Sequence, residues 1–369
     1  MRISRREFLK YCGISAAALG LSAADLAKLE EVLANPNAPT VLWLQGSACT
    51  GCSVSFLNRV SATAPKSAAD TLINSINLAF HPNLMSLAGD SAVAEVEKAY
   101  NAGGYILVVE GGVPTALGGN TCWPWHYNGV DVTFQQAVND LSSRAAAIVC
   151  VGTCASWGGV AAASPNPTGI KGVKAATGKT TINVAGCPPH PDWVAWAIVQ
   201  LLMGNTVALD SNGRPTAIYS RTVHSMCPRR ENDETKTFGV DNRCLKELGC
   251  RGPETRCDCP SIKWNNGVNW CIDANGLCIG CTEPSFPGTN AFYKEFEGGN
   301  EEDPDTGEDP PDEGNNPPDD GDDKDDRDRD DRDRDDKDDK EKSHGRDKGD
   351  RSRNKNRRSS EGRGNNRHR

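Results

Sequence analysis

The chain has 369 residues, enough for about two domains of roughly 150 residues each, and a formal charge of −9 at pH 7. It contains no run of about 18 consecutive apolar residues, so we expect no transmembrane anchor of its own, and we expect no nucleic-acid partner. Fifteen cysteines are too many for an ordinary cytosolic enzyme and too few for a small disulfide scaffold. Metal binding is therefore the first interpretation to consider.

The N-terminal residues 1–34 are typical of an export signal. Residues 4–10 (SRREFLK) place two arginines ahead of a mildly apolar run at 11–24, which is the pattern of a twin-arginine signal peptide. The alternative is an ordinary amphipathic helix in which Arg5 and Arg6 are adjacent by chance. Twin-arginine export moves folded proteins, usually because a cofactor is inserted first. We therefore expect a periplasmic location, either free or held at the membrane or cell surface, and processing near Ala34.

Between residues 39 and 204, short apolar runs alternate with helical patterns. The apolar runs predict buried strands at residues 41–45, 105–109, 146–151 and 181–185. Helical spacing occurs at residues 53–60, 91–101, 133–144 and 192–203. This alternation predicts an α/β fold with a doubly wound parallel sheet that is covered on both faces.

Polar and cysteine side chains follow the four predicted strands directly. They are Cys49 with Cys52, Glu110, Cys154 and Cys187. All of them come just after the carboxyl end of a strand, where an open parallel sheet forms its ligand crevice. We expect these residues to converge, with the neighbouring glycines allowing the backbone to approach a bulky ligand.

From residue 214 to about residue 296 the apolar runs disappear, and Gly, Pro, Trp, Asn and eight cysteines dominate. A segment so poor in core-forming residues needs stapling by disulfides or by metal. Its candidate ligands, in chain order, are His224, Cys227, Cys244, Cys250, Cys257, Cys259, Cys271, Cys278 and Cys281.

The cysteines allow several interpretations. Removal of Cys12 with the signal leaves fourteen, enough for seven disulfides in an exported protein, although a chain exported in folded form would have closed its core beforehand. Two Cys-x-x-Cys pairs could bind zinc, or one could be a thioredoxin-like redox pair. Covalent haem is excluded because Ser53 and Thr282, rather than histidines, follow the pairs. Iron–sulfur clusters take four thiolates each, or three and a histidine, but the ferredoxin spacing is missing. Clusters, zinc and disulfides all stay open on spacing alone.

Several specific motifs give the chain a recognisable pattern. They are residues 43–55 (WLQGSACTGCSVS), 151–159 (VGTCASWGG), 183–193 (NVAGCPPHPDW), 222–228 (TVHSMCP), 244–253 (CLKELGCRGP), 269–271 (NWC) and 278–284 (CIGCTEP). With these motifs the sequence resembles the small, electron-transferring subunit of nickel–iron hydrogenases, most closely the nickel–iron–selenium branch. The resemblance extends from the export signal to about residue 293.

The resemblance assigns ligands by position and implies three [4Fe–4S] clusters, at sites that we call proximal, medial and distal. The proximal set is Cys49, Cys52, Cys154 and Cys187. The medial set is Cys259, Cys271, Cys278 and Cys281. The distal set is His224, Cys227, Cys244 and Cys250, with the histidine in place of one thiolate. Glu110 and Cys257 are candidate auxiliary groups.

The same resemblance implies four parts of the chain. These are a twin-arginine signal (1–34), a flavodoxin-like doubly wound domain with the proximal site (35–205), a small irregular iron–sulfur domain with the medial and distal sites (206–298), and a charged tail (299–369). The tail has no counterpart in the family, and its lack of large apolar residues predicts disorder. We expect it to be a solvated spacer, with an electrostatic docking arm as the alternative.

The remaining candidates receive structural interpretations. They are a buried strand thiol (Cys150), a thiol packed near the crevice (Cys122), a free or spare thiol (Cys257), two structural histidines (His81 and His190) and an interface histidine (His126). Glu110 is the sole carboxylate at these strand ends; its candidate functions are to relay protons or to orient the loop that carries the first two cysteines, and the alternative is that it has no functional role.

By resemblance the chain is part of a heteromeric hydrogenase and is not active alone. Electrons would pass between the nickel–iron centre of a large partner subunit and an external acceptor through the three clusters. The large-subunit interface should surround the proximal site and bury residues 123–125 (WPW) in an obligate contact. Relatives that use a membrane cytochrome b end in a hydrophobic helix, whereas this chain carries charge there. We therefore expect a multihaem c-type cytochrome as the acceptor.

Two other functions remain in contention. One is an exported binding module stapled by zinc or disulfides, which would be colourless where a cluster protein is brown. The other is a cluster subunit of a quinone-reducing complex, which shares the N-terminal fold and the proximal ligands but lacks the extension from His224 to Cys281.

Two positions refine the family assignment. Oxygen-tolerant relatives carry extra cysteines where this chain has Gly51 and Gly159, so we expect an ordinary proximal cluster with four cysteines. Many relatives have proline at the position of Cys271 and a three-iron medial cluster. Cys271 supplies the missing thiolate, so we expect a four-iron medial cluster, and the alternative is that Cys271 is a thiol that only fills space.

Overall fold

The computed structural model describes residues 39–60, 67–68, 76–240 and 242–288. The expected signal with Cys12 and the processing site near Ala34, and the charged tail from residue 299, lie outside the described residues. None of the helices in the described ranges is long and apolar enough to cross a membrane.

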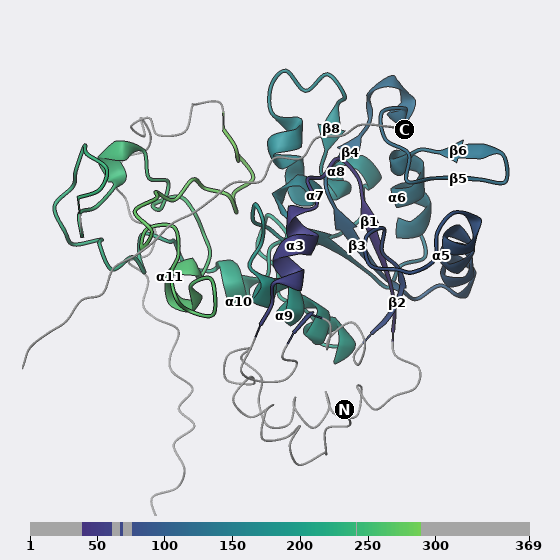
Figure 1. Ribbon diagram of the computed structural model, residues 1–369, viewed down its shortest axis with the longest axis horizontal. Coiled ribbons are helices and arrows are strands. Elements are labelled where there is room, and N and C mark those ends of the chain that lie inside the picture. The colour runs from purple at the N-terminus through teal and green to yellow at the C-terminus, as the bar shows by residue number, and fades with distance from the viewer. Residues whose placement is uncertain (1–38, 61–66, 69–75, 241, 289–369) are drawn as a thin grey trace, which may run out of the picture. The chain divides into compact units, whose positions relative to one another are not determined.

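A five-stranded sheet forms the centre of the N-terminal part (Figure 1). Its strands are β1 (Thr40–Gln45), β2 (Asn77–Phe80), β3 (Ile106–Glu110), β7 (Ala147–Val151) and β9 (Ile182–Val184). All neighbours are parallel, and the order is β2-β1-β3-β7-β9. The four predicted strands are confirmed to within a residue or two at their ends, whereas the edge strand β2 was not predicted. The order reverses between β1 and β3, the place where a flavodoxin-like sheet binds its ligand.

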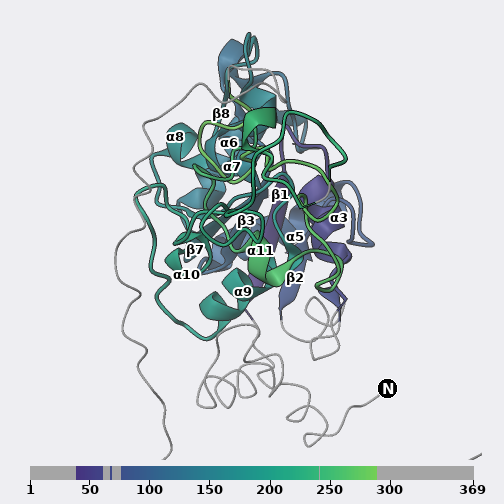
Figure 2. The same ribbon diagram turned by 90° about the vertical axis from the view of Figure 1, so that its left-hand side faces the viewer.

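Helices cover both faces of the sheet, as Figure 1 and the perpendicular view in Figure 2 show. The helices of this part are α3 (Gly51–Leu57), α5 (Asp90–Ala102), α6 (Phe134–Ser142), α7 (Thr153–Trp157), α8 (Val173–Thr177) and α9 (Pro191–Leu202). Alternate strand residues divide the core in two: Trp43 packs with residues of α3 and α9, whereas Leu44 packs with residues of α5, α6 and α8. The strands are therefore apolar on both sides, as a doubly covered parallel sheet requires.

Short elements fill the connections between the main strands and helices. They are β4 (Val113–Pro114) paired with β8 (Ile170–Lys171), β5 (Trp125–Tyr127) paired with β6 (Val130–Val132), and the 3-10 turns η1 (Ala116–Gly119) and η2 (Gly159–Ala162). The hairpin of β5 and β6 turns at Asn128 and Gly129, which both have positive φ angles (50° and 78°). Asn-Gly is the preferred sequence for such a turn.

The C-terminal part has little regular structure, as its composition predicted. Its elements are α10 (Thr216–Tyr219), η3 (Lys246–Leu248) and α11 (Cys259–Ile262). Leu245, Trp270 and Ile272 join the same apolar cluster as Trp43 and the helix α9. This segment therefore packs on the sheet face that carries α3 and α9, and it shares a core with the N-terminal part.

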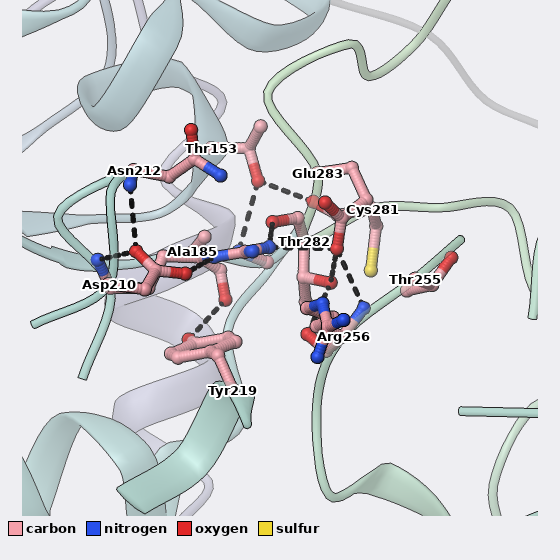
Figure 3. Close-up of polar contacts among 12 residues, drawn as sticks. Thr153, Ala185, Asp210, Asn212, Tyr219, Thr255, Arg256, Cys281, Thr282 and Glu283 are labelled. Carbon is pink, nitrogen blue, oxygen red and sulfur yellow. Dashed lines mark hydrogen bonds and ion pairs between the residues drawn. The ribbon is translucent and has the colours of Figure 1, made fainter. Parts of the chain in front are cut away.

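A buried arginine joins the beginning of the C-terminal part to the loop that follows Cys281. Arg214 is 2% exposed, and its guanidinium donates to Asp210 (2.8 Å), to Glu283 (2.8 Å) and to the Thr282 carbonyl (3.1 Å). Figure 3 shows the acidic partners on either side of this contact, Asp210 from one segment and Glu283 from the other. The two residues that follow Cys281 are thereby fixed, Thr282 by a hydrogen bond to its carbonyl and Glu283 by a buried ion pair.

Candidate functional site

The four proximal cysteines come from three loops that follow β1, β7 and β9. Cys52 and Cys154 are half-buried, and Cys49 and Cys187 are exposed. Burial and, after it, the charges of Glu110, Cys154, Cys49 and Cys187 raise the pKa of Cys52 well above its usual value. The structure thus brings all four thiols, although nearly 140 positions apart in the sequence, to one place at the carboxyl edge of the sheet.

Glycines let the backbone run directly against these sulfurs. A Cβ atom on Gly152 would lie 2.5 Å from Cys52 Sγ, and Gly152 has a φ of +92°. A Cβ atom on Gly159 would lie 2.9 Å from the Cys154 nitrogen, at a φ of +51°. Four thiol donors, with the backbone so close that no side chain fits beside them, match the needs of a bulky thiolate-bound metal group.

Glu110 ends β3 beside the proximal set and is 1% exposed. Its carboxylate accepts five hydrogen bonds, from Trp43 Nε1 (3.1 Å), Gln45 Nε2 (3.1 Å), the backbone N–H groups of Cys52 (3.1 Å) and Ser53 (3.2 Å), and Ser53 Oγ (2.5 Å). Three of these donors, two backbone N–H groups and the Ser53 hydroxyl, lie in the first turn of α3. Glu110 therefore holds the start of the helix that carries Cys52, which favours the orienting role over the proton relay.

His81 extends the network around Glu110. Its Nδ1 accepts from the Asn83 backbone (3.1 Å), so the ring proton is assigned to Nε2, which lies 3.2 Å from Ser53 Oγ. Burial lowers the pKa of His81 to about 4. The ring is thus neutral and donates to Ser53, which in turn donates to Glu110. The expected structural role of His81 agrees with this arrangement, while the part played by Ser53 was missed.

The distal set surrounds a cavity of about 250 Å³, including its opening to solvent. The lining residues are Val223, His224, Cys227, Arg229, Cys244, Leu245, Cys250, Gly252 and Ile272. All four predicted distal residues are among them. Burial raises the pKa of Cys227 and of Cys250, and the charge of Cys244 raises both further. The structure thus gathers one imidazole and three thiols around one space.

The medial set lies between the other two. Burial and, after it, the charge of Cys259 raise the pKa of Cys281, and Cys271 and Cys187 contribute to the same shift. Burial and, after it, the charges of Cys250 of the distal set and of Cys281 raise the pKa of Cys278 well above its usual value. Desolvation and then Cys259 raise the pKa of Cys271, although much of that residue is accessible. The structure therefore brings the four medial thiols together.

The remaining cysteines and histidines lie outside the three ligand sets and make local packing or hydrogen-bond contacts. Burial raises the pKa of Cys150, which lies in β7, to about 12. Cys122 packs against the apolar cluster of α6, and Cys257 is buried and hydrogen-bonded to Cys259. His190 caps α9 by accepting from the Asp192 backbone (3.1 Å). His126 lies on the exposed hairpin, 2.7 Å from Asp131.

All fourteen cysteines in the described residues are free thiols, which disfavours the interpretation as seven disulfides. Within the same part of the chain, no three His, Cys, Asp or Glu side chains are grouped closely enough to hold a single metal ion.

Comparison with known proteins places this geometry in a family. Residues 49–201 match the family described as NADH ubiquinone oxidoreductase, 20 Kd subunit, and residues 219–294 match the C-terminal family of the NiFe/NiFeSe hydrogenase small subunit. The periplasmic [NiFeSe] hydrogenase small subunit of Desulfomicrobium baculatum is 38% identical over 79% of this chain and 99% of its own length. The chain belongs to the hydrogenase small-subunit family.

Further relatives agree with this assignment. The periplasmic [NiFe] hydrogenase small subunit of Solidesulfovibrio fructosivorans is 38% identical over 79% of this chain and 93% of its own length. Among solved structures, recombinant [NiFeSe] hydrogenase of Desulfovibrio vulgaris Hildenborough matches with a TM-score of 0.66 at 37% identity, covering 72% of this chain and 99% of the other. The hydrogenase small-subunit fold, with its parallel central sheet, is therefore confirmed. The quinone-reducing alternative accounts only for the N-terminal match.

Proposed function

We propose that this chain is the electron-transferring subunit of an exported nickel–iron hydrogenase and that its three ligand sets each hold an iron–sulfur cluster. Membership of the hydrogenase small-subunit family supports the function. The observation that carries the cluster assignment is the convergence of Cys49, Cys52, Cys154 and Cys187 at the switch point of the sheet. Such clusters would supply reversible one-electron chemistry.

Residues of the chain hold the proposed ligands of each iron–sulfur cluster in position. Glu110 fixes the first turn of α3, Gly152 brings the backbone against Cys52, and the loops after β7 and β9 deliver Cys154 and Cys187. The proximal ligands are thus held by the rigid sheet, which limits the movement required when the charge of the site changes. The distal set lines an open cavity with His224, and the medial set lies between the two.

The nature of the medial site depends on Cys271. The charge of Cys259, another medial cysteine, raises the pKa of Cys271, which supports a shared ligand role for the two. The Gly276 backbone N–H donates to the Cys271 carbonyl (2.8 Å) and closes the turn between these residues. With a fourth thiolate the site would hold four irons, so we propose [4Fe–4S] clusters at all three sites. Replacing Cys271 by Pro should create the EPR signal of an oxidised three-iron cluster. That signal in the parent, purified without air, would contradict the assignment.

The proximal site should lack the extra thiolates of oxygen-tolerant relatives. Gly51 and Gly159 occupy the relevant positions, and Gly159 lies at a φ of +51° with Cys154 at its side. A cysteine there would strain this backbone. We therefore propose an ordinary proximal cluster that undergoes one oxidation step, and a second oxidation step in a redox titration would contradict this.

Exposed apolar side chains support a large-subunit partner, and the names of relatives support a periplasmic location. Val54 (51% exposed) and Leu57 (41% exposed) present apolar side chains on α3 beside the proximal set, which supports burial there by a large subunit that carries the nickel–iron centre. Several relatives are named periplasmic, which supports export by the twin-arginine signal in residues 1–34. We propose a multihaem c-type cytochrome as the acceptor and retain the division into parts at residues 34, 205 and 298.

The direct test is purification of the chain with its large subunit under anaerobic conditions. We expect about twelve irons and as much sulfide per small subunit, in addition to the large-subunit metals. We also expect bleaching of the brown colour by dihydrogen. A colourless complex, or one whose iron cannot be reduced by dihydrogen, would overturn the proposed function. Zinc in place of iron would favour the stapled binding module.

A further inference from the structure

One buried hydroxyl links the loops that carry three of the proposed ligands. Thr153 directly precedes Cys154 and is 1% exposed. Its Oγ1 accepts from the backbone N–H of Gly186 (3.0 Å), the residue before Cys187, and donates to the carbonyl of Cys281. Figure 3 shows Thr153 with bonds in both directions. The hydroxyl therefore connects the two proximal loops after β7 and β9 to the medial loop.

A second contact also links a proximal loop to the medial loop. The backbone N–H of Cys187, a proximal residue, donates to the sulfur of Cys281, a medial residue. The Thr153 backbone N–H also donates to the Gly186 carbonyl (3.0 Å), which fixes the peptide beside Cys187. Thr153 thus orients both partners of this contact. Its two hydrogen bonds with Gly186 direct the Cys187 amide toward the Cys281 sulfur, and its hydroxyl holds the Cys281 carbonyl.

We infer that Thr153 is a positioning residue that holds Cys281 against Cys187 and so fixes the contact between the proximal and medial sites. This inference rests on the proposed function. With clusters bound, one electron would pass from the proximal to the medial set, oxidising the first and reducing the second by one electron, with no proton transferred and no bond broken. The N–H···S hydrogen bond between Cys187 and Cys281 connects a proximal ligand directly to a medial ligand.

The other hydrogen bonds of the two residues that follow Cys281 go to residues of the C-terminal part, Arg214 and Arg256. Thr282 Oγ1 donates to the Arg256 carbonyl (3.0 Å), and Glu283 accepts from the Arg256 backbone (2.7 Å), both within the C-terminal part. Loss of the Thr153 hydroxyl should therefore leave the medial loop folded but release it from Cys187. An N–H donor stabilises the added negative charge of a reduced cluster, so its loss should lower the reduction potential of the medial site.

The experiment uses the complete hydrogenase complex with Thr153→Val, which keeps the shape of the side chain and removes the hydroxyl. We expect full iron content, a lower medial potential in EPR-monitored titration, and slower reduction of the medial site after dihydrogen addition, by about tenfold, as is typical when a bond supporting a metal ligand is lost. Thr153→Ser should restore both values. Thr115→Val removes a comparable hydroxyl-to-carbonyl bond (2.7 Å), to Gly169, that involves no ligand or residue next to a ligand, and it should change neither.

A measurement on the parent protein tests the inference without any variant, and so does not depend on whether Thr153→Val assembles. The reduced medial site should show a strongly coupled, exchangeable proton in electron–nuclear double resonance, assigned to the Cys187 amide by selective ¹⁵N labelling of cysteine. Absence of that proton, or a fully loaded Thr153→Val complex with parental potential and rate, would overturn the inference while leaving the proposed function intact. A parent complex without clusters would instead overturn the proposed function.

Discussion

The carboxylate of Glu110 shows how one residue can organise a site that it does not enter. A buried charge without partners costs several kcal/mol, but five donors surround this one, including two backbone N–H groups of α3. Ser53 is central because it donates to Glu110 and also contacts His81. The position of Cys52 therefore depends on residues from β1, α3, β3 and the loop after β2.

His81 makes the stability of this network depend on pH. Burial lowers its pKa to about 4, whereas an unfolded imidazole titrates near 6.5. Between these values the unfolded chain binds a proton that the folded chain does not. The contribution of His81 to the free energy of unfolding should be fully present above about pH 6.5. It should fall as the pH drops toward 4, by up to about 1.4 kcal/mol per pH unit.

His81→Gln should remove this dependence while keeping a donor for Ser53. We expect the thermal midpoint of the complex to drop less between pH 7.5 and 5.5 in His81→Gln than in the parent. His126→Gln, on the exposed hairpin, is the matched control and should behave like the parent. An acid loss in His81→Gln as steep as in the parent would show that other groups cause it.

At the scale of elements, the strands were predictable because their burial is continuous. Val108 and Val109 face opposite clusters of the core, so a run of apolar residues was the correct signal for a doubly covered strand. The strand β2 gave no such signal because it lies at the edge of the sheet and only Phe80 is buried. The grouping of the cysteines into three sets was predicted from family motifs, since spacing alone left zinc and disulfides open; their role as ligands stays a prediction.

The turn between β7 and α7 demands glycine for two reasons that a pair of variants can separate. Gly152→Ala introduces a Cβ atom 2.5 Å from Cys52 Sγ at a φ of +92°, whereas Gly178→Ala, at +70°, meets no atom within 4 Å. Both should lose about 1–3 kcal/mol of stability through backbone strain. Only Gly152→Ala should also lose iron, measured per complex. Equal iron in both variants would show that the sulfur position tolerates the added atom.

At the scale of the molecule, a buried ion pair joins the beginning of the C-terminal part to the loop that follows Cys281. Burial opposes the charge of Arg214, but Glu283 and Asp210 together keep its pKa above the usual value. The guanidinium also lies 5.5 Å from the ring centre of Tyr219. No sequence pattern predicted this contact, because Arg214 and Glu283 are 69 positions apart and Arg214 belongs to none of the motifs.

Arg214→Met should therefore loosen the C-terminal part. It leaves two carboxylates without their cation, and we expect a loss of about 3–5 kcal/mol. The matched control is Arg243→Met, which breaks an exposed pair with Asp233 and should cost about 1 kcal/mol or less. Limited proteolysis should cut the segment after Arg214 faster in Arg214→Met alone. Equal cleavage of both variants would contradict a fastening role.

The bond between Thr153 and Cys281 also sets an order for biosynthesis. These residues are 128 positions apart, so at about 5–20 residues per second the ribosome needs roughly 6–26 seconds to make the second after the first. During that interval the sheet and its first three cysteine loops can form, while the segment that closes over them does not yet exist. Delivery of iron to the first site can thus precede closure, and a pause in translation between the two residues would lengthen the time available for it.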